Sequence, residues 1–343
     1  MNSEIKQRLQ QYYRDRVPGK HNAKIERLEN LPSGWESELC AFTLESGPPA
    51  NRACDELVLR IYSGEGARDK SAREFHSLQR LHQVGYPVPR VDLLERDQSP
   101  FGQPFIIMEK IDGEEMWSQI GTPLSGEMRD LVPLFCQLFA QLHHLDWHLF
   151  VDEAEYASLQ DPYAFIDGWL SLAQEGHQRF PHSGLMPVVE WLQVRREAFR
   201  CPGPSPTHND FHPGNVLLCE NGSPVVIDWT GFGISDARFD LAWTLMLIDA
   251  YMGPEWRSRV LQGYERSAGQ VKALEVFEVF AYVRRLFDIS VSLRLGAEKM
   301  GMRPDAVAAM RKNKTAFERV YQLLLARTGI RVIEVEELFA PFG

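Results

Sequence analysis

The chain lacks the features that would place it in a membrane or on nucleic acid. It contains no run of 18 apolar residues, so no membrane-spanning helix is expected. Its 37 basic residues are outnumbered by 47 acidic ones, for a formal net charge of −10. Because nucleic-acid-binding proteins present a basic surface, this balance argues against nucleic acid as a partner.

Cysteines are few, and their spacing suits neither disulfides nor zinc. Their number is odd and they form no C-x-x-C pair, so we expect no disulfide framework and no structural zinc site. The first residues, Met1–Gln7, lack the apolar stretch of a signal peptide, so we expect a cytoplasmic protein. The five cysteines are Cys40, Cys54, Cys136, Cys201 and Cys219.

One stretch of the chain has no lysine at all. Between Ile111 and Glu190 there are 13 acidic residues and two basic ones, Arg129 and Arg179, a balance of −11. The remaining residues are close to neutral, so the net charge is concentrated in this stretch, which we call the acidic segment.

The rest of the composition is that of a globular protein, with 44% apolar and 24% charged residues. A length of 343 residues suggests about two domains or lobes. Strand-like patterns dominate residues 1–108, a connector follows at 109–113, and helical periodicity dominates residues 114–343. We therefore expect an α+β fold with a small strand-rich N-terminal lobe and a larger, mainly helical C-terminal lobe.

Local patterns predict several individual elements. Apolar runs bounded by turn residues indicate strands, and apolar residues at spacings of three and four indicate helices. The sequence Ser71–Glu74 fits a capping box at a helix start. The expected strands are Leu39–Leu44, Glu56–Tyr62 and Pro104–Met108, and the expected helices include Ser71–Val84 and Leu131–Leu145.

A polar loop carries the residues that indicate chemistry. His208, Asp210 and Asn215 form the pattern H-x-D-x-x-x-x-N, which leads into an apolar strand. The dipeptide Asn221-Gly222 then predicts a hairpin with a type I′ turn. This hairpin would return the chain so that Asp228 lies near Asn215.

These residues suit phosphoryl transfer. Asn215 and Asp228 would offer two oxygen ligands to Mg²⁺, a cation that keeps its other positions for water and substrate phosphates. Asp210 would orient a hydroxyl and accept its proton. Asp and Asn also serve ordinary turns, and a single such residue would favour that simpler interpretation. The full pattern, joined by a tight hairpin to a strand-terminal Asp, favours the functional one.

At these residues the chain resembles the aminoglycoside phosphotransferase/choline kinase family, the small-molecule relatives of protein kinases. The resemblance covers about residues 25–300 and is strongest at His208–Asn215 and Ile227–Trp229. It implies a protein-kinase-like bilobal fold and an ATP-dependent kinase, with GTP as an alternative donor. The γ-phosphoryl group would pass to a hydroxyl of a small molecule, with Asp210 as the base and Mg²⁺ on Asn215 and Asp228.

The same resemblance extends to residues that hold the loop in place. His208 would brace the loop. Asp240, in the segment Asp236–Ala242, would tether the loop from a helix start, or would merely cap that helix.

The N-terminal lobe supplies weaker matches to a nucleotide site. Leu31–Glu38 resembles the family's phosphate loop, with Gly34 allowing close backbone approach and Ser33 and Ser37 beside it. No G-x-x-x-x-G-K-[ST] pattern occurs, which excludes a P-loop NTPase. Residues 109–113 resemble the connector that binds adenine, through the backbone of Glu109 and Ile111.

Arg60 stands where protein kinases have the lysine that contacts the α- and β-phosphates. Arginine is always charged and grips phosphate bidentately, so Arg60 is the expected phosphate contact. Its expected partner is Glu74, although the capping box competes for the same carboxylate.

The acidic segment covers the region where this family binds its acceptor. Carboxylates lining a cleft would concentrate a cationic acceptor, such as an aminoglycoside or an amino alcohol. Four tryptophans in the segment or beside it could wall an ammonium site. Equally, the acids could lie on solvated helix faces and the tryptophans in the core. His143 is expected to be a packed or surface residue. The tryptophans are Trp117, Trp147, Trp169 and Trp191.

Two other functions remain open. A pseudokinase-like regulator would bind nucleotide without turning it over, but the joint presence of Asp210, Asn215 and Asp228 argues against it. A protein kinase is disfavoured because the chain lacks G-x-G-x-x-G-x-V and an Ala-Pro-Glu segment, and has Asp-Trp-Thr where protein kinases have Asp-Phe-Gly. The acceptor and the oligomeric state are not determined by these patterns.

Overall fold

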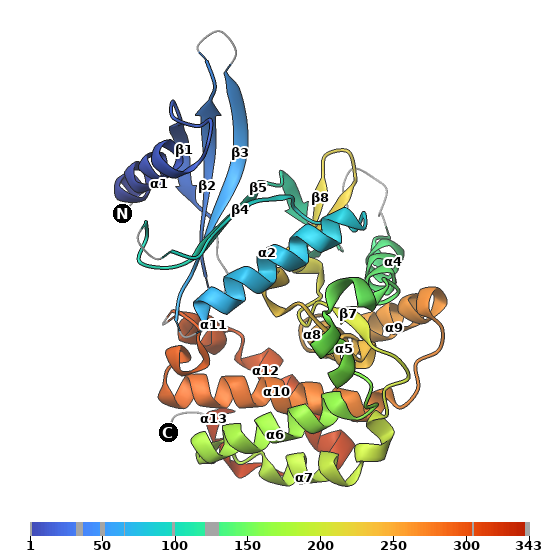
Figure 1. The fold of residues 1–343 in the computed structure, drawn as a ribbon. Coiled ribbons are helices and arrows are strands. Elements are labelled where there is room, and N and C mark those ends of the chain that lie inside the picture. Colours follow the sequence, from blue (N-terminus) through green and yellow to red (C-terminus); the bar gives the residue numbers. More distant parts are fainter. Residues whose placement is uncertain are drawn as a thin grey trace. The chain divides into compact units, whose positions relative to one another are not determined.

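In a computed structural model, the chain divides into two compact units, which are described separately below (Figure 1). The first unit comprises Met1–Glu114, Leu217–Thr230 and Gly301–Arg303, and the second comprises the rest of the chain. The structure describes residues 2–31, 37–48, 52–64, 66–97, 100–120, 130–303 and 305–339.

The first unit is built on an antiparallel five-stranded sheet with the order β1-β2-β3-β5-β4. Side chains alternate between its faces, as the pleat of a strand requires. Leu57, Leu59 and Ile61 of β3 pack in a core with α1 (Asn2–Arg16). The strands are β1 (Lys24–Asn30), β2 (Ser37–Ser46), β3 (Ala53–Tyr62), β4 (Val91–Glu95) and β5 (Phe105–Glu109).

The other face of β3 meets a helix that begins earlier than the sequence suggests. Helix α2 spans Ala67–Gln83 and starts at Gly66, which has a φ of +77°, and it has no side-chain cap. Ser71 is therefore in the second turn, where its hydroxyl donates to the Arg68 carbonyl. The predicted capping box at Ser71–Glu74 is wrong, and the Glu74 carboxylate is left for a different partner.

The hairpin after the polar loop is present, but its turn differs from the prediction. Strands β8 (Val216–Cys219) and β9 (Pro224–Val226) are joined by four residues, and β6 (Gly113–Glu115) pairs with β8. Gly222 has a φ of +81°, whereas Asn221 has no positive φ and its side chain accepts from the Ser223 N–H. A type I′ turn needs positive φ at both central residues, so that prediction is wrong.

Leu217–Thr230, most of this hairpin, belongs to the first unit, whereas the sequence patterns placed it in the C-terminal lobe.

The second unit is mainly helical and is centred on two buried helices. Every residue of α8 from Phe239 to Asp249 is buried, and α10 contributes fourteen buried residues. A short antiparallel pair, β7 (Ser205–Thr207) and β10 (Gly233–Ser235), completes it. The longer helices are α4 (Val132–His143), α6 (Ala164–Arg179), α7 (Met186–Val194), α8 (Ala237–Met252), α9 (Pro254–Ala268), α10 (Leu274–Leu295) and α12 (Lys314–Thr328). The shorter ones are α3 (Met116–Gln119), α5 (Glu153–Ser158), α11 (Ala306–Lys312) and α13 (Ile333–Phe339).

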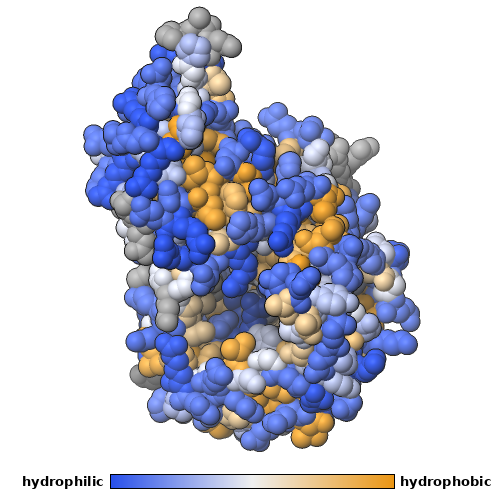
Figure 2. All heavy atoms as spheres, in the orientation of Figure 1, coloured by the Kyte–Doolittle hydropathy of each residue, from blue (hydrophilic) through white to orange (hydrophobic). Residues whose placement is uncertain are grey.

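The surface is that of a charged protein. Hydrophilic residues predominate on the face shown in Figure 2, and hydrophobic residues gather there in smaller patches. Of the helices in the described part of the chain, none has both the length and the apolar character needed to cross a bilayer.

Candidate active site

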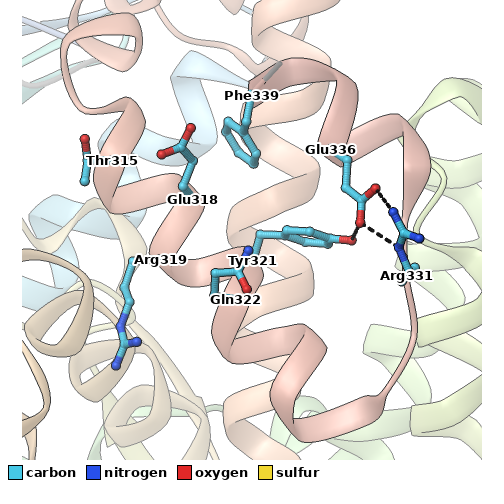
Figure 3. Close-up of a pocket in the computed structure, with 8 residues that line it drawn as sticks. All are labelled: Thr315, Glu318, Arg319, Tyr321, Gln322, Arg331, Glu336 and Phe339. Atoms are coloured by element: carbon cyan, nitrogen blue, oxygen red, sulfur yellow. Dashed lines mark hydrogen bonds and ion pairs between the residues drawn. The ribbon is translucent and has the colours of Figure 1, made fainter. Parts of the chain in front are cut away.

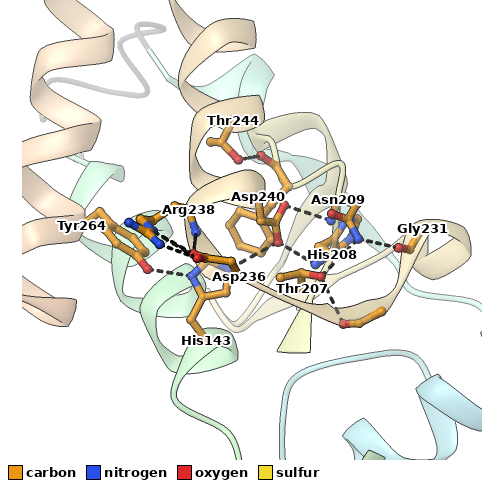
Figure 4. A network of polar contacts seen from close by, with 12 residues as sticks. His143, Thr207, His208, Asn209, Gly231, Asp236, Arg238, Asp240, Thr244 and Tyr264 are labelled. Atoms are coloured by element: carbon orange, nitrogen blue, oxygen red, sulfur yellow. Dashed lines mark hydrogen bonds and ion pairs between the residues drawn. The ribbon is translucent and has the colours of Figure 1, made fainter. Parts of the chain in front are cut away.

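The polar loop of the second unit follows β7, and the carboxylate of Asp240 holds its backbone in place. Asp240, in the first turn of α8, is fully buried, and it accepts from the backbone N–H of His208 at 2.6 Å and of Asn209 at 2.9 Å (Figure 4). The cap of α8 is Asp236, which accepts from the Arg238 N–H at 2.9 Å. Asp240 therefore tethers the loop, and the capping role belongs to Asp236.

A buried histidine supports this tether from the other side. His143 of α4 places Nε2 at 3.3 Å from Asp240 and Nδ1 at 2.7 Å from the Tyr264 hydroxyl (Figure 4). Burial, with Asp240 and Asp236 nearby, raises the pKa of Tyr264 well above its usual value, so this phenol stays protonated. His143 is thus a packed residue, as expected, and its partner is the residue that holds the loop.

The loop makes a left-handed turn under a close backbone contact. Asn209 has a φ of +63°, and its Nδ2 donates to the Gly231 carbonyl at 2.9 Å and to the Thr207 hydroxyl at 3.1 Å. A Cβ on Gly231 would lie 2.8 Å from the His208 carbonyl oxygen. Glycine is required at position 231 because the loop passes directly over it.

Asp210 is presented at the surface of this loop. One carboxylate oxygen accepts from the Trp243 indole N–H at 2.8 Å, the other lies 3.7 Å from His212 Nε2, and the side chain is 45% exposed. Burial by itself would raise the pKa of Asp210. The positive charge of His212 and the hydrogen bonds from His212 and from the Trp243 N–H outweigh this effect and hold the pKa well below its usual value. Asp210 is therefore ionised at neutral pH and ready to accept a hydrogen bond from a hydroxyl.

His208 and Asn215 are arranged around Asp210. The His208 ring is buried and meets Phe211 edge-on at 5.7 Å between centroids, and Phe211 stacks on Phe139 of α4 at 4.2 Å. Asn215 Nδ2 donates to the Asp210 carbonyl at 2.9 Å, which leaves Oδ1 as the acceptor of that amide. The structure thus brings His208, Asp210 and Asn215 together in one unit.

Two residues of this arrangement were missed by the sequence analysis. Trp243 lies three residues after Asp240, so both side chains project from one face of α8 toward the loop. The Arg284 guanidinium of α10 lies 4.0 Å from the centre of the Trp243 ring, and its Nη1 donates to the Asn209 carbonyl at 3.4 Å. The spacing from Asp240 could have indicated Trp243, whereas nothing local in the sequence indicated Arg284.

The first unit contains a second cluster, around Arg60. Arg60 Nη1 donates to Glu74 at 3.0 Å and Nη2 to Asp228 at 2.8 Å, and the Tyr62 hydroxyl also donates to Glu74. The Arg60 and Glu74 side chains are only 6% and 1% exposed. Burial raises the pKa of Glu74, and Arg60 opposes that effect. Of the two roles considered for Glu74, the structure shows the pair with Arg60.

Asp228 adopts a backbone conformation unusual for its residue type. Its φ is +62°, and its Oδ1 accepts from the Thr230 hydroxyl at 3.0 Å as well as from Arg60. The next residue, Trp229, is buried, with its indole edge-on to Tyr86 and its N–H donating to the Val226 carbonyl. The buried indole holds the turn that directs the Asp228 carboxylate to Arg60.

The other predicted nucleotide contacts are dispersed along the first unit. Ser37 is buried at the start of β2, opposite Tyr62 in the register. At the end of β5, the Glu109 N–H donates to the Arg90 carbonyl. The Ile111 N–H donates to no backbone carbonyl of the described residues. Ser33 and Gly34 lie outside the described residues.

The carboxylates of the acidic segment face solvent. Of the acidic residues described there, all are exposed except Asp167, which is half-buried and forms two 2.6 Å hydrogen bonds with Arg196. The four tryptophans have separate partners, and of these four only Trp117 lies beside the loop, with its ring 6.3 Å from that of His212.

Within the described ranges, no three His, Cys, Asp or Glu side chains cluster as metal ligands would.

Comparison with known proteins identifies the family. The model of the phosphotransferase enzyme family (APH) matches residues 27–275. No curated protein matches the chain.

Many solved structures share the fold. The Plasmodium vivax ethanolamine kinase has a TM-score of 0.60 at 14% identity, covering 88% of this chain and 83% of its own. An aminoglycoside-3'-phosphotransferase of type VIII has a TM-score of 0.53 at 21% identity, covering 83% and 99%. A spectinomycin phosphotransferase, in complex with ADP and spectinomycin, has a TM-score of 0.54 at 14% identity, covering 90% and 94%.

These neighbours confirm the predicted α+β, protein-kinase-like fold, and the family match covers most of the chain. The chain belongs to the phosphotransferase enzyme family and is a phosphotransferase.

Proposed function

We propose that the protein is an ATP-dependent kinase of the cytoplasm that phosphorylates a hydroxyl group of a small molecule. The observation that carries the proposal is the Asp210 carboxylate, which is ionised, half exposed and oriented by Trp243 on a loop fixed by Asp240. Its placement supports a role in orienting the acceptor hydroxyl. Two of the structural neighbours are named for the phosphorylation of ethanolamine and of spectinomycin, which supports a small-molecule acceptor.

In the proposed reaction, the acceptor oxygen forms a bond to the γ-phosphorus while the bond from that phosphorus to the bridging oxygen breaks and ADP leaves. The hydroxyl proton passes to Asp210. Phosphoryl transfer has a loose transition state, in which the bond from the acceptor oxygen to phosphorus is only partly formed. The base therefore needs to do little to activate the hydroxyl and mainly positions it. A carboxylate with a lowered pKa is adequate for that task.

Arg60 is the proposed contact of the nucleotide phosphates. A buried guanidinium held between two carboxylates has little freedom to move, so its position is fixed before nucleotide binds. Glu74 would keep it oriented. Ser33, Gly34 and Ser37 as the phosphate loop, and the backbone of Glu109 and Ile111 as the adenine contact, remain proposals from the family resemblance. ADP in the spectinomycin phosphotransferase supports an adenine nucleotide, with GTP as the alternative.

Mg²⁺ is the proposed metal, with Asn215 and Asp228 as its protein ligands. Their donor chemistry fits: Asn215 retains Oδ1 as an acceptor and Asp228 supplies a carboxylate. Two oxygen ligands suit Mg²⁺, because this ion fills its remaining positions with water and nucleotide phosphates. When bound, the ion would neutralise charge on the transferred group. The pair is proposed from the sequence motif, since Asn215 and Asp228 belong to different units.

A cationic acceptor, such as an aminoglycoside or amino alcohol, is proposed from the balance of −11 in the acidic segment. Its carboxylates are exposed, so they would act at long range by attracting a cation rather than by direct contact. Such attraction decreases with ionic strength.

The test is nucleotide consumption with Mg²⁺ across aminoglycosides, amino alcohols and sugars. Asp210→Asn should abolish acceptor-dependent ADP formation while Mg²⁺-ATP binding, measured by calorimetry, stays near wild type. Asp15→Asn, at an exposed position on α1, is the matched control and should retain activity. Full activity of Asp210→Asn would refute the assignment. Nucleotide binding without turnover of any acceptor would favour the pseudokinase-like alternative.

A further inference from the structure

An apolar cavity of about 170 Å³ lies inside the second unit, where α6, α7 and α10 pack together. Figure 1 shows these three helices side by side. Gly176 of α6 allows this approach, because a Cβ there would lie 3.0 Å from the Phe287 ring of α10. Most of the lining is apolar, and His177, Ser183, Arg284 and Asp288 are its polar members. The apolar lining consists of Trp169, Leu172, Ala173, Leu185, Met186, Val189, Val283 and Phe287.

Two polar atoms in the wall of this cavity lack a hydrogen-bond partner among the described residues. Ser183, only 3% exposed, and His177 both line it, and the buried Ser183 Oγ and His177 Nδ1 have no hydrogen-bond partner among the described residues. A buried polar atom without a partner is costly and therefore rare in native proteins. The pair is explained if an occupant of the cavity supplies the missing hydrogen bonds.

The cavity is connected to the loop that carries Asp210. Arg284 lines the cavity, stacks on Trp243 and donates to the Asn209 carbonyl. Trp243 in turn donates to Asp210. Two side chains thus separate the cavity from the proposed base, and all of these residues belong to the second unit.

The size and lining of the cavity limit its occupant. A cavity of about 150 Å³ with an apolar wall holds benzene. At about 170 Å³, this one accommodates a single six-membered ring or a branched alkyl group of similar size. It is too small for the several rings of an aminoglycoside.

A larger hollow, of about 540 Å³, is less suited to selecting a ligand. It lies against α12 and α13, and its charged groups already have ion-pair partners, Arg331 and Glu336 within the lining itself (Figure 3). Arg331 forms an ion pair with Glu336, which also accepts from the Tyr321 hydroxyl, and Arg319 is paired with Asp249.

We propose that the cavity between α6, α7 and α10 binds the apolar part of the acceptor, which is therefore an amphiphilic hydroxyl compound with a ring-sized apolar group. The inference rests on the proposed function, since it assigns this group to the molecule whose hydroxyl Asp210 orients. A hydrogen-bonding substituent on the apolar group would pair with Ser183 and His177. Such a molecule can also carry one ammonium group, which the acidic segment would attract.

Two amino alcohols form a matched pair of probes. Phenylalaninol and alaninol share a primary hydroxyl and an ammonium group, and differ only by a phenyl ring. We expect calorimetry to show that phenylalaninol binds about tenfold or more tightly than alaninol, because the ring is buried in an apolar pocket. With Mg²⁺-ATP, we expect kcat/KM to differ in the same direction.

A pair of variants ties this preference to the cavity. Ala173→Leu fills the cavity from α6 and should abolish the preference for phenylalaninol without changing Mg²⁺-ATP affinity. Ala157→Leu adds the same side chain at an exposed position on α5 and should keep the preference. Circular dichroism and thermal unfolding would show that both variants fold.

The outcomes separate the inference from the proposed function. Equal binding of the two probes, or a preference that survives in Ala173→Leu, would overturn the cavity assignment even if both compounds were phosphorylated. Failure of phenylalaninol and benzyl alcohol to bind would do the same. Ring binding that depends on Ala173, without phosphoryl transfer to any compound, would overturn the proposed function and the acceptor role of the cavity.

Discussion

Replacement of Asp240 by asparagine tests whether one buried carboxylate holds the loop of Asp210. The carboxylate accepts from the backbone N–H groups of His208 and Asn209, one at each oxygen. Asparagine has nearly the same shape but only one oxygen, so one N–H would face an amide NH₂ instead of an acceptor. The variant therefore removes a hydrogen bond with little change in volume.

The expected loss of stability follows from these contacts. A hydrogen bond to a charged group contributes about 1.5–3 kcal/mol, and a buried donor left without a partner costs about 1–3 kcal/mol. The remaining bond also loses its charge. We therefore expect Asp240→Asn to lower the free energy of unfolding by about 3 kcal/mol. For a unit of this size that corresponds to a fall in Tm of roughly 6–12 °C.

A neighbouring residue provides the control. Thr244 lies one turn further along α8, and its hydroxyl donates to the Phe211 carbonyl at 2.6 Å, a single uncharged bond to the same loop. Thr244→Val should cost about 1 kcal/mol. Differential scanning calorimetry at pH 7 compares the two variants, and kcat should fall further for Asp240→Asn. The reasoning would be refuted if Asp240→Asn were no more destabilising than Thr244→Val.

Three further substitutions test other contacts. Glu74→Gln leaves the buried Arg60 with a weaker partner, so it should destabilise the first unit by about 3 kcal/mol and weaken ATP binding, as measured by urea unfolding and calorimetry. Trp243→Phe removes a hydrogen-bond donor from Asp210 and so raises its pKa. The acid limb of the kcat/KM profile should therefore move to higher pH, and an unmoved limb would exclude this role for the indole. Gly231→Ala forces a Cβ against the His208 carbonyl, and should cost about 1–3 kcal/mol and lower kcat, whereas wild-type thermal stability would contradict the contact.

The sequence alone determined the family resemblance, the α+β class and most elements that carry the site. The spacing of His208, Asp210 and Asn215 is informative because it combines residue types with separate chemical tasks. Short-range rules were less reliable. The capping box at Ser71 and the type I′ turn at Asn221 fit local preferences, yet the helix starts earlier and Asn221 lacks the positive φ that a type I′ turn needs. Local preferences are worth about 1 kcal/mol, and packing readily overrides them.

The tertiary structure decided which of these side chains contact one another. Glu74 could have capped a helix or paired with Arg60, and only the packing of α2 on β3 shows the pair. Asp240 reaches back 32 positions to His208, and His143 meets it from a different helix. Arg284 and the cavity beside it arise where three helices meet. No local pattern encodes such contacts, because they depend on where distant helices meet in the folded chain.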